Sequence, residues 1–422
     1  MNRHIKGWRG ILGAAAFGVL LSGCDLFEVV NPGPIIDSAL DEEAAGKTVL
    51  IGVAADVEVA VDAMAWLGGP ASTDLDADAT QPWLQDAGEG RLTVTNAESS
   101  WNPMQLARWG AGAGIARLTE TQSDAATNQW LTAAYMWAGW ANRILGDNVC
   151  IAVFGGEDTD GDGNADPGRV EASDMHYTRA LERFETARSR AQGGGHDSIA
   201  VASTAGMAQA NLILGNYSAA ASLAAQIPDD FRWVAYRSDN SGREWNSVWQ
   251  FTHENQKQIT VWSMYNDSIG PDTDPRVPWR DMNQTSGGGV KPFYRQLKYT
   301  DRADDYPLAK GHEMRLIEAE AMLRMGDRQG AIDKINYVRE RVGVPPVMAS
   351  TDSEAWLVLD RERNFELWLE ARRLKDNARF AAENLSPWAV AFMQGRHSCF
   401  PPSLAECSAN PNVTGNSYCS QG

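Results

Sequence analysis

The sequence has few positive charges for its length. Its 422 residues include 37 Lys and Arg against 55 Asp and Glu, which gives a formal net charge of −18. A chain this acidic is repelled by a phosphate backbone, which argues against nucleic acid as a partner. The same charge suits solubility, divalent cations and neutral ligands.

The chain also lacks a recognisable catalytic motif. His253 and His312 each precede a Glu but are not followed by the second His of H-E-x-x-H, and the six His residues are too scattered for a metal cluster. The Gly-Lys-Thr at 46–48 resembles the end of a phosphate-binding loop, but Asp41 stands where such a loop needs its first Gly. We therefore expect a protein that is not an enzyme.

Long apolar runs are missing as well. The uncharged run Gly10–Leu21 has only twelve residues, follows three basic residues and leads into Leu-Ser-Gly-Cys24. This pattern predicts a signal peptide over residues 1–23 and a lipobox, after which Cys24 becomes the lipidated first residue. Several acyl chains anchor a protein stably. Asp25 leaves the sorting between inner and outer membrane open, and the mature chain would carry a charge of about −21.

Cysteine is scarce but even in number once Cys24 is set aside. Cys150, Cys399, Cys407 and Cys419 allow three pairings, and an exported protein favours disulfides over the alternative of four free thiols. The last three lie in the tail, residues 384–422, whose Pro-, Ser- and Asn-rich part 398–422 has no helical or strand periodicity. We expect disulfides to order this tail.

Related segments recur along the chain and predict pairs of helices. Residues 208–227 and 319–338 carry small residues at the same offsets around Gly215 and Gly326, which suits two closely packed helices joined by a tight turn. A third copy ends at Gly146, with its partner helix over Asp174–Ala191, and a fourth pair is plausible around Trp101–Leu118. The fold expected is mainly α, built from tetratricopeptide-like pairs.

An aromatic-rich region with many turn residues follows at 229–310. Residues 247–253 and 258–265 alternate enough to be short strands. Aromatic rings on loops can stack on the apolar face of a sugar, which makes four Trp residues candidate ligand contacts, with core or interface positions as the alternative. The candidates are Trp245, Trp249, Trp262 and Trp279, whereas Trp130, Trp137, Trp140, Trp356 and Trp368 have spacings typical of core.

An acidic insert at 157–171, between the helices of the third pair, resembles a calcium-binding loop. Its oxygen ligands would occupy alternate positions around a Gly turn, as Ca²⁺ requires, although Arg169 stands where a bidentate Glu is usual. A solvated acidic turn is the alternative. The ligands expected are Asp158, Asp160, Asp162, Asn164 through its carbonyl, and Asp166.

A structural calcium ion in this loop would stabilise the fold. We expect Ca²⁺ to raise the melting temperature, because a ligand that binds only the folded state stabilises it. Asp160→Ala combined with Asp162→Ala should remove the effect. Thermal unfolding with and without Ca²⁺ measures it, and a wild-type protein insensitive to calcium would refute the site.

Near the carboxyl terminus, residues 359–380 carry a regular array of charges. Glu362, Glu366 and Glu370 recur every four residues among apolar side chains and Arg residues, which indicates a buried face crossed by ion pairs. The spacing resembles the signature E-R-x-x-E-L-x-x-E-(G)-x-R-x-x-D-(L)-x-R of the SusD/RagB family. Its positions are filled by Glu362, Arg363, Glu366, Leu367, Glu370, Arg373, Asp376 and Arg379, while Ala371 replaces the usual Gly and Asn377 the usual Leu, both compatible with a helix.

The resemblance implies a nutrient-binding lipoprotein, anchored in the outer membrane and exposed at the cell surface, that passes oligosaccharide or peptide to a SusC-like TonB-dependent transporter. It also implies a SusD-like scaffold spanning the helical regions 24–228 and 311–383. The charged array would then be structural. Two alternatives stay open: an adaptor that binds only proteins, and a helical surface glycan hydrolase.

Overall fold

The structure, a computed structural model, describes residues 37–155, 166–253, 255–262, 265 and 273–420. Most of these residues are helical, which confirms the predicted fold class. The α-helices are α1 (Gly46–Ala71), α2 (Pro82–Gly88), α3 (Glu98–Thr121), α4 (Gln129–Asn148), α5 (Met175–Gly194), α6 (Asp197–Ile213), α7 (Tyr217–Ala224), α8 (Ser247–Thr252), α10 (Gly311–Arg324), α11 (Arg328–Arg341), α12 (Asp352–Glu366), α13 (Arg373–Ala382), α14 (Pro387–Met393) and α15 (Leu404–Ala409).

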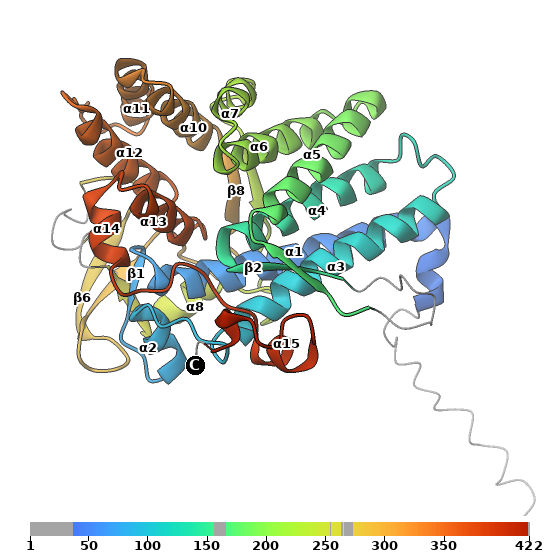
Figure 1. The fold of residues 1–422 in the computed structure, drawn as a ribbon, viewed down its shortest axis with the longest axis horizontal. Helices are drawn as coiled ribbons and strands as arrows, with labels where there is room; N and C mark the ends of the chain where they lie inside the picture. The colour runs from blue at the N-terminus through green and yellow to red at the C-terminus, as the bar shows by residue number, and fades with distance from the viewer. Residues whose placement is uncertain (1–36, 156–165, 254, 263–264, 266–272, 421–422) are drawn as a thin grey trace, which may run out of the picture.

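The helices follow one another in an arc. Helices α3 to α7 lie side by side, and α10, α11 and α12 continue the arc toward α13 and α14 (Figure 1). Helix α1 runs beneath the arc and contacts both α3 and α13, so it links the two ends of the scaffold. None of the helices in the described residues has the length and hydropathy needed to cross a bilayer.

Three predicted helix pairs are present as α4–α5, α6–α7 and α10–α11. Gly215 and Gly326, at the turns of the last two, have φ angles of 80° and 84°, a left-handed conformation that glycine adopts at little cost. In these pairs, side chains cap the N-termini of α4 and α11. Asn128 accepts the Leu131 N–H, and Asp327 accepts the Gly330 N–H. The fourth segment is the single helix α3, which packs against α1.

Glycine permits close packing in the middle of this stack. The Phe184 ring of α5 is fully buried between Gly139 of α4 and Gly206 of α6. A Cβ atom at these glycines would lie 2.6 Å and 2.4 Å from the ring. The three helices therefore approach closely only because both positions lack a side chain.

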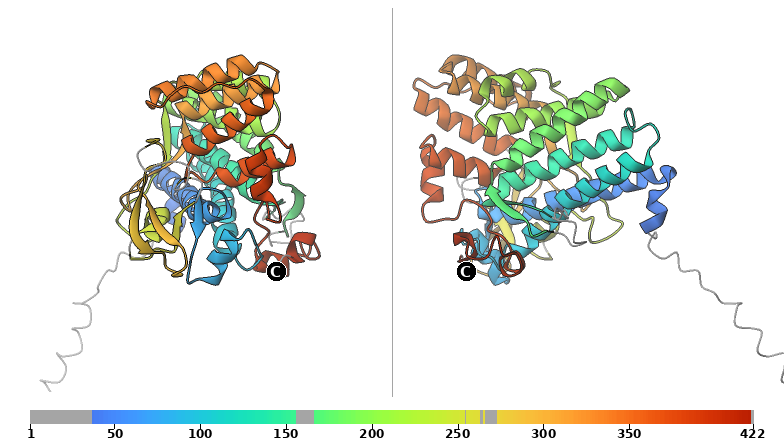
Figure 2. Two further views of the ribbon diagram at one scale, coloured as in Figure 1. Left: turned by 90° about the vertical axis from the view of Figure 1, so that its left-hand side faces the viewer. Right: turned by 45° about the vertical axis from the view of Figure 1, so that its right-hand side comes forward.

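In the described part of the chain, strands are short and occur in four antiparallel pairs. The pairs are β1 (Leu75–Ala77) with β5 (Ile259–Val261), β2 (Ile151–Phe154) with β3 (Arg169–Ala172), β4 (Arg232–Ala235) with β8 (Tyr306–Lys310), and β6 (Trp279–Thr285) with β7 (Pro292–Gln296). Pairing of Arg232 with Lys310 brings the two ends of the aromatic-rich region together. In the left view of Figure 2, the β6–β7 hairpin lies on one side of α1, and the tail and the β2–β3 hairpin lie on the other.

One predicted strand is wrong. Residues 247–252 form α8, because the Asn246 side chain accepts the Trp249 N–H at 2.9 Å and so caps a helix at this point. The second predicted strand, at 258–265, contains β5.

The charged segment is also not one helix. Helix α12 ends at Glu366 and α13 begins at Arg373, and between them Leu369 and Ala371 have φ angles of 60° and 59°. This left-handed conformation costs an L-residue about 1–2 kcal/mol. It explains why glycine is usual at position 371, and it corrects the prediction that Ala371 lies in a helix.

The tail is ordered by contacts with α4 and by two disulfides. Cys150 is bonded to Cys399 and Cys407 to Cys419. Beside the first disulfide, the Cys150 N–H donates to the Phe400 carbonyl at 3.0 Å, and Phe400 is fully buried. Contrary to the sequence pattern, residues 404–409 form the short helix α15, which is capped by Ser403.

Candidate functional site

A pocket of about 580 Å³ opens between α1, α4 and the segment that follows β4. We refer to it as the α1–α4 pocket. Its volume lies within the range of about 300–1,000 Å³ that is typical of small-molecule sites. It is lined by Leu50, Ile51, Ala54, Ala55, Glu58 and Val59 of α1, by Ala133, Met136 and Trp137 of α4, by Ile199 of α6, and by Trp233, Tyr236, Arg237, Ser238, Arg243 and Glu244.

Three aromatic rings form one side of the α1–α4 pocket. The Trp137 ring is only 5% exposed, and its centroid lies 6.4 Å from that of Trp233, which is half-buried. Tyr236 is 63% exposed. The rings therefore extend from the buried wall of α4 to the protein surface, and Tyr236 is free to stack on a ligand.

Polar groups around the α1–α4 pocket are held in fixed positions. Buried Arg237 donates hydrogen bonds to the backbone carbonyls of Glu58 (3.1 Å), Arg243 (2.7 Å) and Trp245 (3.0 Å), which ties the segment after β4 to α1. Arg243 forms an ion pair with Asp56 at 2.7 Å. The loop that carries Tyr236 is thus anchored before any ligand arrives, which lowers the entropy cost of binding.

Glu58, which lines this pocket, has a raised pKa. Burial raises the pKa of its carboxyl group to about 7, although the Tyr236 N–H at 3.2 Å and the Arg237 guanidinium both favour the charged form. At neutral pH the group is therefore present in both protonation states. It can accept a hydrogen bond or donate one.

The four Trp residues proposed from the sequence do not form one site. Trp279 is 7% exposed and packs edge-on against Tyr294 at 5.3 Å, so the structure places it in the core rather than against a ligand. The other three are half-buried: the Arg302 guanidinium lies over both Trp245 and Trp249, and Trp262 packs against Phe392. None of these four described side chains lines the α1–α4 pocket.

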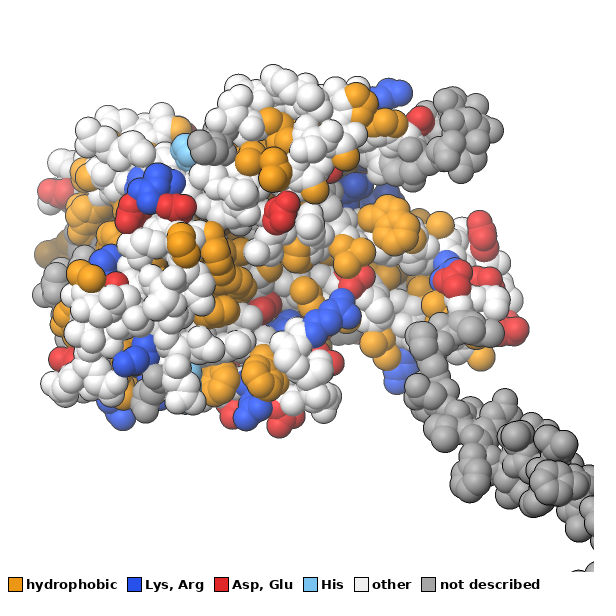
Figure 3. All heavy atoms as spheres, turned by 90° about the horizontal axis from the view of Figure 1, so that it is seen from below, with side chains coloured by type: hydrophobic (Ala, Val, Ile, Leu, Met, Phe, Trp, Pro, Cys, Tyr) orange, Lys and Arg blue, Asp and Glu red, His pale blue; other side chains and the backbone are white. Residues whose placement is uncertain are grey.

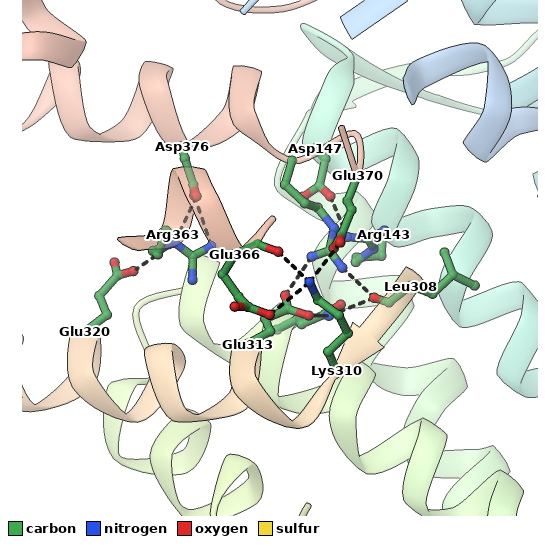
Figure 4. A network of polar contacts seen from close by, with 12 residues as sticks. Arg143, Asp147, Leu308, Lys310, Glu313, Glu320, Arg363, Glu366, Glu370 and Asp376 are labelled. Atoms are coloured by element: carbon green, nitrogen blue, oxygen red, sulfur yellow. Dashed lines mark hydrogen bonds and ion pairs between the residues drawn. The ribbon is translucent and has the colours of Figure 1, made fainter. Parts of the chain in front are cut away.

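Four charged residues of the carboxyl-terminal signature, Arg363, Glu366, Glu370 and Asp376, lie in a buried network of ion pairs (Figure 4). Arg363 donates two hydrogen bonds to Asp376, at 2.8 and 3.2 Å, and Arg379 bonds the same carboxylate at 2.8 Å. Lys310 of β8 lies 3.0 Å from Glu366 and 2.8 Å from Glu370. The network therefore joins β8, α10, α12 and α13.

Two carboxylates of this network, Asp376 and Glu366, are held in the ionised state. Burial alone would raise the pKa of Asp376, but Arg363 and Arg379 hold it well below its usual value. In the same way Lys310 overcomes the effect of burial on Glu366 and keeps the pKa of its carboxyl group low. These charges already have protein partners, which favours a structural role, because removing one partner would leave the other buried without its counter-charge.

The cavity beside the network is too small for a sugar. It lies at Arg143, Asp147, Glu313 and Arg372 and has a volume of about 20 Å³, which is room for about one water molecule. This favours the structural interpretation of the signature residues over an active site.

The carboxyl-terminal part of the chain is similar to a known protein family. Residues 302–416, which contain most of the ion-pair network, match the SusD family. This carboxyl-terminal segment is of the SusD family. A comparison with curated protein sequences found no match.

Solved structures show the same fold over most of this chain. A SusD superfamily protein from Bacteroides thetaiotaomicron is 14% identical, with a TM-score of 0.69 over 88% of this chain and 98% of that one. A SusD superfamily protein from Parabacteroides distasonis is 13% identical, with a TM-score of 0.66 over 87% of this chain and 98% of that one. A SusD-like carbohydrate binding protein from Bacteroides vulgatus is 14% identical, with a TM-score of 0.59 over 80% of this chain and 83% of that one.

Several predicted sites of this protein lie outside the described residues. They are the signal peptide, the lipidated Cys24, and Asp158, Asp160, Asp162 and Asn164 of the acidic loop. Asp166 is described and lies three residues before β3. Among the residues that the structure covers, no group of three or more His, Cys, Asp or Glu side chains could hold a metal ion. Calcium binding therefore stays a prediction.

Sequence reasoning missed the residues of the α1–α4 pocket. Trp137 was correctly predicted to be buried, but it is also the inner wall of the pocket. Trp233 and Tyr236 belong to the aromatic-rich region, and their spacing of three residues around a short strand was the available signal. Glu58 carried no signal, because one acidic residue on a helix is ordinary.

Proposed function

We propose that this SusD-family protein captures oligosaccharide in the α1–α4 pocket and passes it to a SusC-like TonB-dependent transporter. One observation carries the choice of site: the 63% exposed Tyr236 lies at a pocket that Trp233 and Trp137 also line. A sugar ring stacks its apolar face on such rings, while its hydroxyl groups need polar partners. Ser238, Arg243 and Glu244 line the same pocket and offer them.

The chemistry proposed is binding without bond cleavage. Similarity to a structure described as a SusD-like carbohydrate binding protein supports this choice. Asp56, Glu58 and Glu244 lie in or beside the pocket, so a helical glycan hydrolase remains the alternative with a specific observation behind it. A hydrolase would release new reducing ends from a glycan, whereas a binding protein would leave the glycan intact.

Delivery to a transporter requires a fixed place at the membrane. We propose that Cys24 carries the lipid anchor, that the protein lies on the outer face of the outer membrane, and that the tetratricopeptide-like helices meet the transporter barrel. On the underside of the molecule, away from the arc of helices, apolar side chains are intermingled with charged side chains of both signs (Figure 3). An adaptor that binds only proteins would share the anchor but would bind no glycan.

Tyr236→Ala tests the site. We expect the affinity for a bound oligosaccharide to fall about tenfold or more, which corresponds to about 1.4 kcal/mol, because the stacking surface is removed from an exposed position that folding does not need. Isothermal titration calorimetry over a panel of oligosaccharides measures the change. A reducing-end assay on the same panel tests the hydrolase.

Trp388→Ala is the matched control, since Trp388 is also an exposed aromatic residue, at 42%, but lies on α14. Its affinity should equal that of the wild type. Full affinity in Tyr236→Ala, or an equal loss in both variants, would exclude the α1–α4 pocket as the site. Absence of any binding across the panel would contradict glycan capture itself.

A further inference from the structure

The walls of the α1–α4 pocket differ in chemistry. One part of the lining, which we call the floor, is apolar. It consists of Leu50 and Ala54 from α1, Ala133 and Met136 from α4, and Ile199 from α6. The groups able to form hydrogen bonds, among them Ser238 and Arg243, come chiefly from the segment after β4. A ligand that fills the pocket must therefore be polar on one side and apolar on the other.

An unsubstituted hexose does not meet this requirement. Each of its hydroxyl groups needs a hydrogen-bond partner, and burying one against aliphatic side chains leaves it without one. The sugar can stack on Tyr236 at the pocket mouth, but its ring should not enter the apolar floor. The part of the ligand that reaches Ala54 and Met136 must carry carbon and no hydroxyl group.

We infer that the α1–α4 pocket selects glycans whose rings carry an N-acetyl group, with the sugar stacked on Tyr236 and the acetyl methyl group against the floor of α1 and α4. The inference rests on the proposed function and names its substrate class. The acetamide combines an apolar part with polar groups, as the lining of the pocket requires. Its methyl group is apolar, and its N–H and carbonyl can pair with Glu58, the acidic group that α1 contributes to the lining.

The state of Glu58 suits an amide. With a pKa of about 7 the carboxyl group can accept the acetamide N–H when ionised and donate to the acetamide carbonyl when protonated. Its neighbour Tyr236 N–H already bonds one carboxyl oxygen at 3.2 Å, so the orientation of the group is set by the protein. An apolar peptide side chain could also fill the floor, and its backbone amide could pair with Glu58, but a peptide lacks the apolar sugar face that stacks on Tyr236 at the pocket mouth.

Two oligosaccharides that differ in one group test the inference. Chitotriose and cellotriose are both β-1,4-linked, and they differ only in the acetamide or hydroxyl group at C2. We expect chitotriose to bind the wild-type protein at least tenfold tighter at pH 7 by isothermal titration calorimetry. Ala54→Leu should fill the floor and abolish this preference while binding of cellotriose persists. Ala116→Leu, at an exposed position of α3, should leave the preference intact.

The outcomes separate the inference from the proposed function. Equal affinity for the two sugars, both lost in Tyr236→Ala, overturns the inference and leaves glycan capture standing. Preference for chitotriose that survives Ala54→Leu overturns the placement of the acetyl group. Tighter binding of an apolar tripeptide than of either sugar overturns the substrate class. If neither sugar nor any oligosaccharide of the wider panel binds, the proposed function itself is wrong.

Discussion

Arg363→Ala lowers the free energy of unfolding by about 3 kcal/mol. Removing one partner of a buried ion pair costs about 3–5 kcal/mol, because the other charge stays buried without its counter-charge. Both side chains of the Arg363–Asp376 pair are at most 5% exposed, and two hydrogen bonds join them. We expect the lower end of the range, because Arg379 still bonds Asp376 at 2.8 Å in the variant.

The measurement is denaturant unfolding of the wild type and the variant, with oligosaccharide affinity measured in parallel. Arg328→Ala is the matched control: Arg328 pairs with Asp352 at 2.8 Å, but the two side chains are 42% and 73% exposed. Such a pair contributes about 0–1 kcal/mol. If Arg363→Ala leaves stability unchanged and abolishes binding instead, the signature residues belong to a ligand site and not to the scaffold.

The same pair makes stability depend on pH in a known direction. The pKa of Asp376 is lowered in the folded state, so its contribution is present above the unfolded-state pKa of about 3.9 and is lost as the pH falls through the folded-state value. Without Arg363 the folded-state pKa should rise toward the ordinary value. The difference in stability between wild type and variant should therefore shrink in acid and be largest near neutral pH.

Phe184→Ala lowers the free energy of unfolding by about 3–5 kcal/mol. This is the usual range for truncating a fully buried Phe, because the removed ring leaves a cavity that the neighbours fill only in part. Phe184 contacts Trp140 edge-on at 4.9 Å and lies against Gly139 and Gly206, so the cavity would open where three helices meet. Thermal and denaturant unfolding measure the loss. Leu106→Ala, at a 48% exposed position of α3, should cost under about 1 kcal/mol.

A double-mutant cycle with Gly206→Ala tests the cause. In the wild type the new methyl group would lie 2.4 Å from the Phe184 ring and should destabilise the protein. In the Phe184→Ala background the methyl group occupies the cavity and improves helix propensity by about 1 kcal/mol, so the same change should stabilise. Additive effects of the two substitutions would contradict close packing of these helices.

Local sequence patterns predicted the helix pairs well because a hairpin depends on neighbouring residues. The apolar periodicity on each side of Gly215 and Gly326 and the glycine at each turn specify two helices and the place where the chain reverses. The same kind of reasoning went wrong at 247–252, where alternation was read as a strand although Asn246 caps a helix. It also went wrong at Ala371, where the left-handed backbone is set by the junction of α12 with α13.

The candidate site was far less accessible to sequence reasoning. Exposure decides which aromatic residue can meet a ligand, and it depends on what other segments pack over the ring. Trp279 lies in a region rich in turn residues yet is covered by the core, whereas Tyr236, without any stronger pattern, is 63% exposed. Composition counts aromatic residues but does not separate these two cases.

By itself the sequence determined the helical scaffold and the signature that resembles the SusD/RagB family, because each is encoded in residues that are close together in the chain. Its composition determined the acidic net charge. Only the tertiary structure decided where the candidate ligand pocket lies. The α1–α4 pocket combines residues 50–59, 133–137, 199 and 233–244, which meet only after α1, α4, α6 and β4 have packed together. That packing is a property of the whole core, so no local period or spacing could have shown it.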